Sequence, residues 1–322
     1  MAQAYRKDPE TGKWVAYDPQ DDKKVKAKEA GSSLPVSVRR KELEQYAATI
    51  DQLADNASSS LELVLNDILQ DFDPNMPEKE WKELREGLIE YLYQTRTYWG
   101  DSAGLEACEF YDKVITNREG VGRYNSAQLP EQVSRKSCAD SVRALSHYLF
   151  EGKADKFVEK MLENAHNGVR QFANSTVMFN TRRDGTKGVR YARVPMGVET
   201  CAFCIMLASR GFVYYSKKTA GENEHMHPHC NCKIVPGFEG DVIEGYDNKV
   251  YLNIYEAAAT GYKSGDRGRN LDNILNYMRR EILYPVHKDG INEKKRLWWE
   301  KNKDDQNAKR RAKRKNRADD KE

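Results

Sequence analysis

The 322-residue chain has a net charge of +3 and is polar for its length, with 39% hydrophobic and 32% charged residues, where typical soluble domains have about 45–50% apolar and about 25% charged residues. No run of about 18 to 20 apolar residues is present, which excludes an integral membrane protein built on spanning helices, and the N-terminal segment lacks the apolar stretch of a secretory signal peptide. At about 150 residues per domain, the length allows about two domains.

The charge is distributed unevenly along the chain. Residues 294–322 carry 13 Lys/Arg against 6 Asp/Glu, a net charge of +7, whereas residues 35–293 have a net charge of −5. We therefore expect a mildly acidic, soluble body followed by a cationic segment that contacts an anionic partner.

Residues 1–34 mix charged residues with Gly, Pro and Ser and show no helical period. This composition predicts a flexible N-terminal arm. A chain end without a function is an equally good interpretation, although Trp14 and Tyr17 offer two aromatic side chains for docking on a neighbour.

From Pro35 onward the apolar residues recur every three or four positions, which is typical of amphipathic helices. The first helix is predicted to end before Pro74 and Pro77, and a second runs from about Glu78 to Trp99. Shorter helical patterns follow at 101–117, 129–150 and 153–180, and no strand pattern is visible before residue 185. The apolar residues of the first helix are Leu43, Tyr46, Ile50, Leu53, Ala57, Leu61, Val64, Ile68 and Phe72.

After residue 184 the Gly, Pro and aromatic content rises, and the runs GVRYARVP and RGFVYYS resemble short strands. A helical pattern returns beyond residue 240. The sequence therefore predicts a mainly α protein in five parts: a flexible arm (1–34), an elongated helical domain (35–184), a small α+β zinc-binding module (185–240), a C-terminal helical segment (241–293) and a basic, disordered tail (294–322).

Seven Cys and His residues between positions 201 and 232 are candidate metal ligands. Cys201 and Cys204 form a CxxC pair whose two thiolates can chelate one ion, and HxHCxC follows within 30 residues. Zn²⁺ suits this set of sulfur and nitrogen donors, and the sequence leaves open which four donors bind it. The candidate ligands are Cys201, Cys204, His227, His229, Cys230 and Cys232, with His225 as a further donor.

A structural zinc site is favoured over a catalytic one, because seven donors can close a four-ligand shell without an open position for water. The metalloprotease motif HExxH and the zinc-deaminase order are absent, although Glu222 and Glu224 precede the His residues. The alternative to metal binding is a group of buried or redox-labile thiols beside a His-rich loop.

The same segment resembles the MuF-like minor head proteins of tailed bacteriophages. That family combines a CxxC, introduced by a P-x-G…T turn, with a terminal H-P-x-C-x-C. The matching residues here are Pro195, Gly197, Thr200, Cys201, Cys204, His227, Pro228, Cys230 and Cys232, and His229 stands where many members have a small polar residue. The resemblance covers residues 153–240 well.

The resemblance implies a minor capsid protein of the virion that lies near the portal, is present in the host cytoplasm during assembly, and has the phage portal and capsid proteins as partners. It further implies a role in head morphogenesis or in DNA packaging or ejection. Because no catalytic motif is found, we do not expect an enzyme. Two other classes remain open: a zinc-dependent enzyme acting on nucleic acid, such as a nuclease delivered with the genome, and a cellular zinc-ribbon protein that binds nucleic acid.

The C-terminal tail concentrates cations without forming an apolar face. Its composition favours a disordered arm that binds nucleic acid without reading its sequence and disfavours membrane insertion. The resemblance implies that this nucleic acid is the phage DNA. A solubilising tail is the alternative. Trp298 and Trp299 could stack on bases but are better explained as packing on the body. The expected phosphate contacts are Lys309, Arg310, Arg311, Lys313, Arg314, Lys315 and Arg317.

Overall fold

The computed structural model is mainly helical, which confirms the predicted fold class at that level. The chain forms two compact units, Met1–Asn253 and Ile254–Glu322. The residues that the structure describes are 4–7, 14–17, 36–70, 72–118, 124–131, 134–196, 200–215, 232–262 and 271–283.

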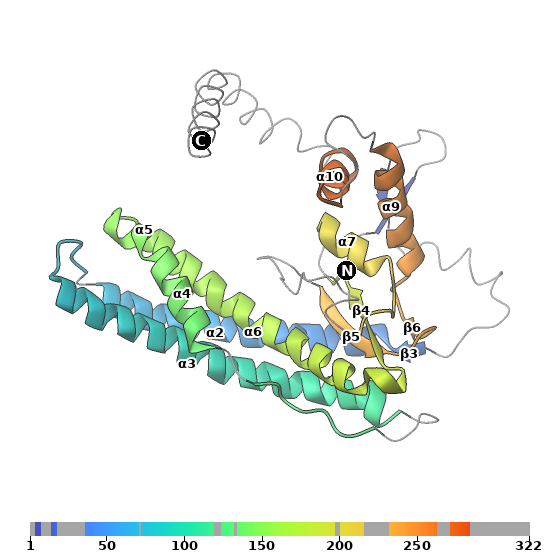
Figure 1. Cartoon of the computed structure of the whole chain (residues 1–322), viewed down its shortest axis with the longest axis horizontal. Coiled ribbons are helices and arrows are strands. Elements are labelled where there is room, and N and C mark those ends of the chain that lie inside the picture. The colour runs from blue at the N-terminus through green and yellow to red at the C-terminus, as the bar shows by residue number, and fades with distance from the viewer. Residues whose placement is uncertain are drawn as a thin grey trace, which may run out of the picture. The chain divides into compact units, whose positions relative to one another are not determined.

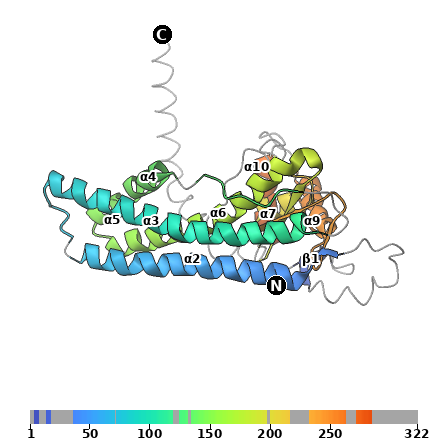
Figure 2. The same cartoon turned by 90° about the horizontal axis from the view of Figure 1, so that it is seen from below.

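Three long helices form a bundle in the first unit: α2 (Arg40–Leu69), α3 (Glu78–Tyr111) and α6 (Ala154–Asp184) lie alongside one another (Figures 1 and 2). The predicted break between the first two helices is confirmed, since α2 ends at Leu69 and Pro77 is the N-cap residue of α3. A short 3₁₀ turn, η2 (Gly185–Lys187), follows α6 directly.

Helix α3 continues past the predicted end at Trp99 and passes into a π-helical turn, η1 (Asp112–Thr116). Gly100 and Gly104 lie inside α3, where the Phe172 ring of α6 packs against both positions. A Cβ at Gly104 would lie 2.8 Å from the Phe172 ring, so only glycine leaves room for that ring. The prediction of a break near residue 100 was therefore wrong.

Two short helices, α4 (Arg135–Leu145) and α5 (His147–Phe150), pack against one end of the bundle. They divide the segment that was predicted to be helical over 129–150, and residues 129–131 are not helical. The apolar core at this end combines side chains from all five helices. Its fully or almost fully buried members are Leu61, Leu65, Leu88, Ile89, Leu92, Cys138, Ala139, Val142, Leu149, Phe157, Met161 and Ala165.

Three strands precede residue 185, which contradicts the expectation that none would. β1 (Ala4–Lys7) pairs antiparallel with β2 (Trp14–Tyr17), and β3 (Val36–Val38) pairs parallel with β6 (Val242–Ile243). Each of these strands has only two to four residues, too few to show an alternating pattern in the sequence. The partner of β3 lies about 200 positions away, so no local signal marks it.

A small module built on one strand pair follows the bundle. β4 (Arg190–Val194) pairs antiparallel with β5 (Lys233–Gly237), and α7 (Ala202–Ala208) packs on β4. The predicted strand in GVRYARVP is confirmed. Among its described residues, the second run, RGFVYYS, contributes a single bridge between Tyr214 and Tyr191.

The end of η1 is tied to the module by an ion pair. Both terminal nitrogens of Arg118 donate to the carboxylate of Asp241, at 2.6 and 2.9 Å. The Asp241 carboxylate also accepts a hydrogen bond from the backbone N–H of Phe238, just after β5. This bidentate contact fixes the chain as it leaves the strand pair.

The predicted helical pattern beyond residue 240 is present in α9 (Asn248–Gly261) and in α10 (Leu271–Tyr277), which continues as the π-helical η3 (Met278–Leu283). In the second unit the rings of Tyr262 and Tyr277 meet edge to face, with centroids 6.1 Å apart.

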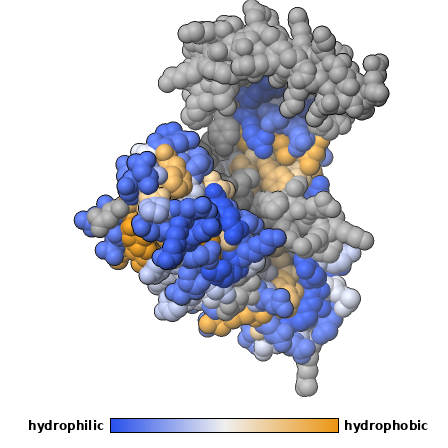
Figure 3. Space-filling model, turned by 60° about the vertical axis from the view of Figure 1, so that its left-hand side comes forward, coloured by the Kyte–Doolittle hydropathy of each residue, from blue (hydrophilic) through white to orange (hydrophobic). Residues whose placement is uncertain are grey.

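No helix in the described part of the chain is long and apolar enough to cross a membrane. On the face drawn in Figure 3, most of the described residues are hydrophilic and the hydrophobic ones are exposed in separate patches. This agrees with the high charged fraction of the sequence.

Candidate metal centre

Three of the predicted zinc ligands lie together in the module. Cys204 and Cys232 form a buried cluster, 1% and 3% exposed, and Cys201 packs against it. Cys201 and Cys204 stand at the start of α7, and Cys232 directly precedes β5. The other predicted ligands, His227, His229 and Cys230, lie outside the described residues, as do His225, Glu222 and Glu224.

Cys201 is the N-cap residue of α7. Its backbone is extended, and its Sγ accepts a hydrogen bond from the backbone N–H of Cys204 at 3.3 Å. Helix α7 is almost wholly apolar and buried, so it stays fixed in the module. The Tyr214 hydroxyl donates to the carbonyl of Leu207 near the end of the helix, at 2.9 Å. The CxxC pair is therefore held in a defined geometry.

The bundle positions the third cysteine through Asn174 of α6, a side chain that is only 2% exposed. Its Oδ1 accepts a hydrogen bond from the backbone N–H of Ile234 at 2.9 Å, and its Nδ2 donates to the carbonyl of Cys232 at 3.5 Å. One side chain of the bundle thus holds the backbone on both sides of Lys233.

Lys233 points into the bundle and forms a buried charge cluster there. Its Nζ lies 2.7 Å from Oδ1 of Asp51, and Nε of Arg170 lies 3.1 Å from the same oxygen. Burial lowers the pKa of Lys233; Asp51 opposes this shift and Arg170 adds to it. One carboxylate thus compensates two buried cations, and removing it would leave both without that compensation.

Sequence reasoning did not identify Asn174, Lys233, Asp51 or Arg170. A lysine inside an otherwise apolar strand is an unusual feature, but its partner Asp51 is 182 positions away. No local pattern connects two residues at such a separation.

The chemistry of the gathered donors fits zinc. Three cysteine side chains from two segments of the chain pack in one cluster, and soft thiolate ligands select zinc among the common divalent ions. Within the described ranges, however, no three His, Cys, Asp or Glu side chains converge as a metal-binding group. The zinc site therefore stays a prediction that depends on a donor from residues 227–230 as well.

The cationic residues predicted to contact nucleic acid, Lys309 to Arg317, also lie outside the described residues. The nucleic-acid interface therefore stays a prediction.

Comparison with known proteins identifies the family. A family model described as "VG15 protein" matches residues 37–258, a segment that contains both the bundle and the strand-pair module. None of the curated proteins and none of the solved structures matches the chain. The chain belongs to the VG15 protein family, a family of viral or phage proteins. The prediction is confirmed at the level of a viral or phage protein, and the narrower MuF-like identity stays a prediction.

Proposed function

From membership of the VG15 family, we propose that the protein is a minor structural component of the phage head that lies near the portal and acts in head morphogenesis or in DNA packaging and ejection. The observation that carries the proposal is the extent of the family match, which includes the bundle and the module as one continuous segment. The motif that resembles MuF-like minor head proteins supports it, because Cys201, Cys204 and Cys232 of that motif lie in one buried cluster.

The module's role in this proposal is to hold a structural zinc ion. Cys201, Cys204 and Cys232 would bind it, together with one donor from His227, His229 and Cys230. When bound, zinc supplies a cross-link between α7 and β5, and its binding free energy adds to the stability of the module. Asn174 and Lys233 keep Cys232 in position from the side of the bundle.

A structural role is a better explanation than catalysis, because the cysteines that would bind the metal are buried. Cys204 and Cys232 are 1% and 3% exposed, and the buried residues of α7 around them are apolar. A catalytic zinc ion keeps one position for water or substrate. The competing function, a zinc-dependent nuclease, would need such a position on the side of residues 222–230.

The direct test of the proposed function is the composition of phage particles. Purified virions are expected to contain the chain in few copies. Deletion of its gene is expected to give heads that fail to package or deliver DNA, and a plasmid-borne copy should rescue them. Absence of the chain from purified virions, with normal DNA-filled heads in the deletion strain, would contradict the proposal.

The basic tail is proposed to contact the phage DNA. Deleting residues 294–322 leaves a chain with a net charge of −4, and we expect it to bind duplex DNA more weakly and with less dependence on salt. Each phosphate contact that is lost reduces the log–log salt slope by about 0.9. Fluorescence anisotropy over a salt series measures this slope. Equal, salt-insensitive binding by both chains would shift the tail's partner to an acidic surface of the portal or capsid.

A further inference from the structure

Arg96 of α3 is a buried cation that forms no ion pair with the residues that the structure describes. Its side chain lies between α3, α4 and α6, and the residue is only 9% exposed. In the part of the chain that the structure describes, no carboxylate forms an ion pair with it, and its Nε is buried without a hydrogen bond. Arginine stays protonated in proteins, and a buried charge without a counter-ion is costly.

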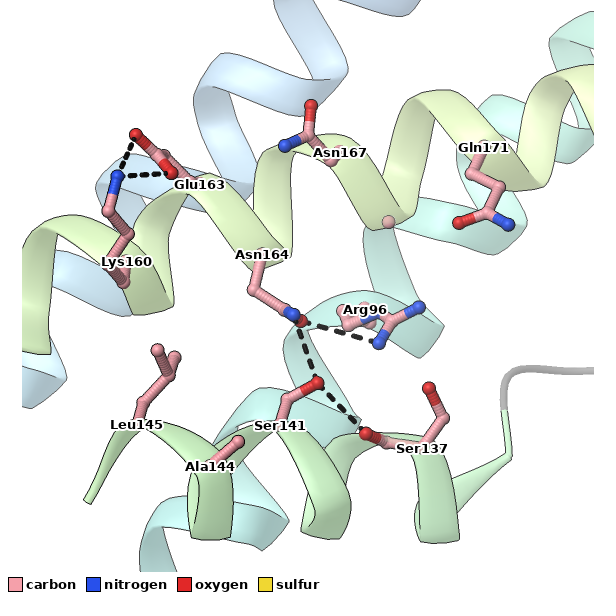
Figure 4. A pocket seen from close by; sticks show the side chains of 11 residues that line it. Arg96, Ser137, Ser141, Ala144, Leu145, Lys160, Glu163, Asn164, Asn167 and Gln171 are labelled. Atoms are coloured by element: carbon pink, nitrogen blue, oxygen red, sulfur yellow. Dashed lines mark hydrogen bonds and ion pairs between the residues drawn. The ribbon is translucent and has the colours of Figure 1, made fainter. Parts of the chain in front are cut away.

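The contacts that Arg96 does make are with neutral groups. Its Nη1 donates to Oδ1 of Asn164 at 3.4 Å and lies 3.7 Å from Sγ of Cys138. The Asn164 Nδ2 in turn donates to the Ser141 hydroxyl at 3.0 Å. This chain of hydrogen bonds fixes the guanidinium (Figure 4) but leaves its charge uncompensated.

Gly168 of α6 is part of the same arrangement. A Cβ at this position would lie 2.4 Å from Nε of Arg96 and 3.0 Å from its Cζ. The guanidinium therefore lies directly against the α6 backbone, and glycine is the residue that allows this approach. The Arg96 side chain, which comes from α3, thus contacts both α4 and α6.

A cleft of about 410 Å³ opens beside Arg96 between α4 and α6. The Ser137 hydroxyl and the Gln171 amide point into the same space as the guanidinium (Figure 4). Neither side chain donates a hydrogen bond within the described residues, and the Nη2 of Arg96 makes none either. Three donors thus surround a cleft that a small ligand could enter.

The remaining charges of the cleft do not compensate Arg96. Glu163 lines it, but both of its oxygens accept hydrogen bonds from Lys160, each at 2.8 Å. The lining therefore keeps one net positive charge, from Arg96. Charge-assisted hydrogen bonds from a guanidinium to a carboxylate or phosphate are stronger than hydrogen bonds between neutral groups.

We propose that this cleft binds a small oxyanion, a phosphate or a carboxylate group, through Arg96 with Ser137 and Gln171 as further donors. A single uncompensated cation and a small cleft suit a compact anion. An extended polyanion such as DNA would also meet the net negative charge of residues 35–293, which repels it.

The test is isothermal titration calorimetry of the full chain with inorganic phosphate and, separately, with acetate, at an ionic strength held constant with chloride. We expect one saturable site for at least one of the two anions. Arg96→Gln is expected to weaken it by at least about tenfold, as for loss of a hydrogen bond to a charged group. The matched control is Arg143→Gln on α4, where an exposed arginine pairs with Asp140; its affinity should equal that of the wild type.

Binding of phosphate alone would identify a phosphate site, and binding of acetate alone would identify a carboxylate as the natural ligand group. If Arg96→Gln fails to fold by circular dichroism, Ser137→Ala replaces it, because that change leaves the buried guanidinium in place; a weaker affinity supports the site. The proposal is overturned if neither anion binds, if Arg96→Gln binds as tightly as Arg143→Gln, or if Ser137→Ala leaves the affinity unchanged.

Discussion

The interactions within the bundle differ from those that attach the strand-pair module to it. In the bundle, apolar side chains from α2, α3, α4, α5 and α6 form a continuous core around residues such as Leu92 and Phe157. The module has a single five-residue strand pair. Its β5 strand is fully buried, and polar contacts link it to the bundle: Asn174 bonds the backbone of Ile234, and Lys233 pairs with Asp51.

Because of this difference, substitutions in the two regions should have different effects on stability. A bundle core of many similar contacts loses stability as a whole when one large side chain is removed. In the module, buried hydrogen bonds link β5 to the bundle and a metal ion is predicted, so the loss of one of these interactions should loosen the strand pair locally. Matched substitutions in the bundle and in the module distinguish a global loss of stability from a local one.

The largest effect is expected from Phe157→Ala in the bundle core. Phe157 is fully buried, and such truncations cost about 3–5 kcal/mol of unfolding free energy. Phe179→Ala is the matched control on the same helix, because Phe179 is 36% exposed, and it should cost about 1 kcal/mol or less. Urea denaturation followed by circular dichroism measures both. Equal losses would contradict the assignment of the core.

Asn174→Ala should have a smaller and more local effect. It removes hydrogen bonds to Ile234 and Cys232, at a cost of about 1–3 kcal/mol, and β5 should exchange its amide hydrogens faster. Asn180→Ala is the control, because this buried asparagine of the same helix instead bonds the backbone of Gln128, at 2.9 Å in both directions.

Hydrogen exchange with mass spectrometry resolves the two variants. Faster exchange confined to β5 in Asn174→Ala, and to the segment around Gln128 in Asn180→Ala, is the expected pattern. If both variants loosen β5 equally, Asn174 does not anchor the strand.

The smallest effect is expected from protonation of His166 in the bundle. Burial lowers the pKa of His166 below its ordinary value of 6.5 and nearby Arg170 lowers it further, against the opposing effect of Asp55 and Asp51. Between the folded pKa and 6.5 the unfolded chain binds more protons, so stability should fall as the pH decreases through this window.

His166→Gln should flatten this part of the stability curve, whereas His147→Gln, which replaces an exposed imidazole, should leave it unchanged. Urea denaturation at a series of pH values below 7 measures the slope. An unchanged slope in His166→Gln would show that other groups cause the acid sensitivity.

The sequence predicted those features that local patterns determine. The apolar period from Leu43 onward identified α2, and Pro74 and Pro77 marked its end. Cys201, Cys204 and Cys232, which were predicted to bind one ion, lie in one cluster, while metal binding itself stays a prediction. The helix prediction was confirmed because helical periodicity is a property of a short segment.

The features that sequence reasoning missed depend on distant partners. Gly100 and Gly104 resemble a helix end until Phe172 of α6 is seen to pack against them. β3 is three residues long and is defined by its pairing with β6. The contact of Lys233 with Asp51, and the position of Arg96 without an ion pair among the described residues, likewise arise from the packing of separate helices and strands.

Zinc analysis combined with hydrogen exchange tests the central claim that the module, unlike the bundle, depends on a structural metal ion. The account predicts about one zinc ion per chain, lost on chelation or in Cys201→Ser, with faster exchange in β4 and β5 while α2, α3 and α6 stay protected. A metal-free chain whose β4 and β5 are as well protected as in the zinc-loaded protein would contradict it.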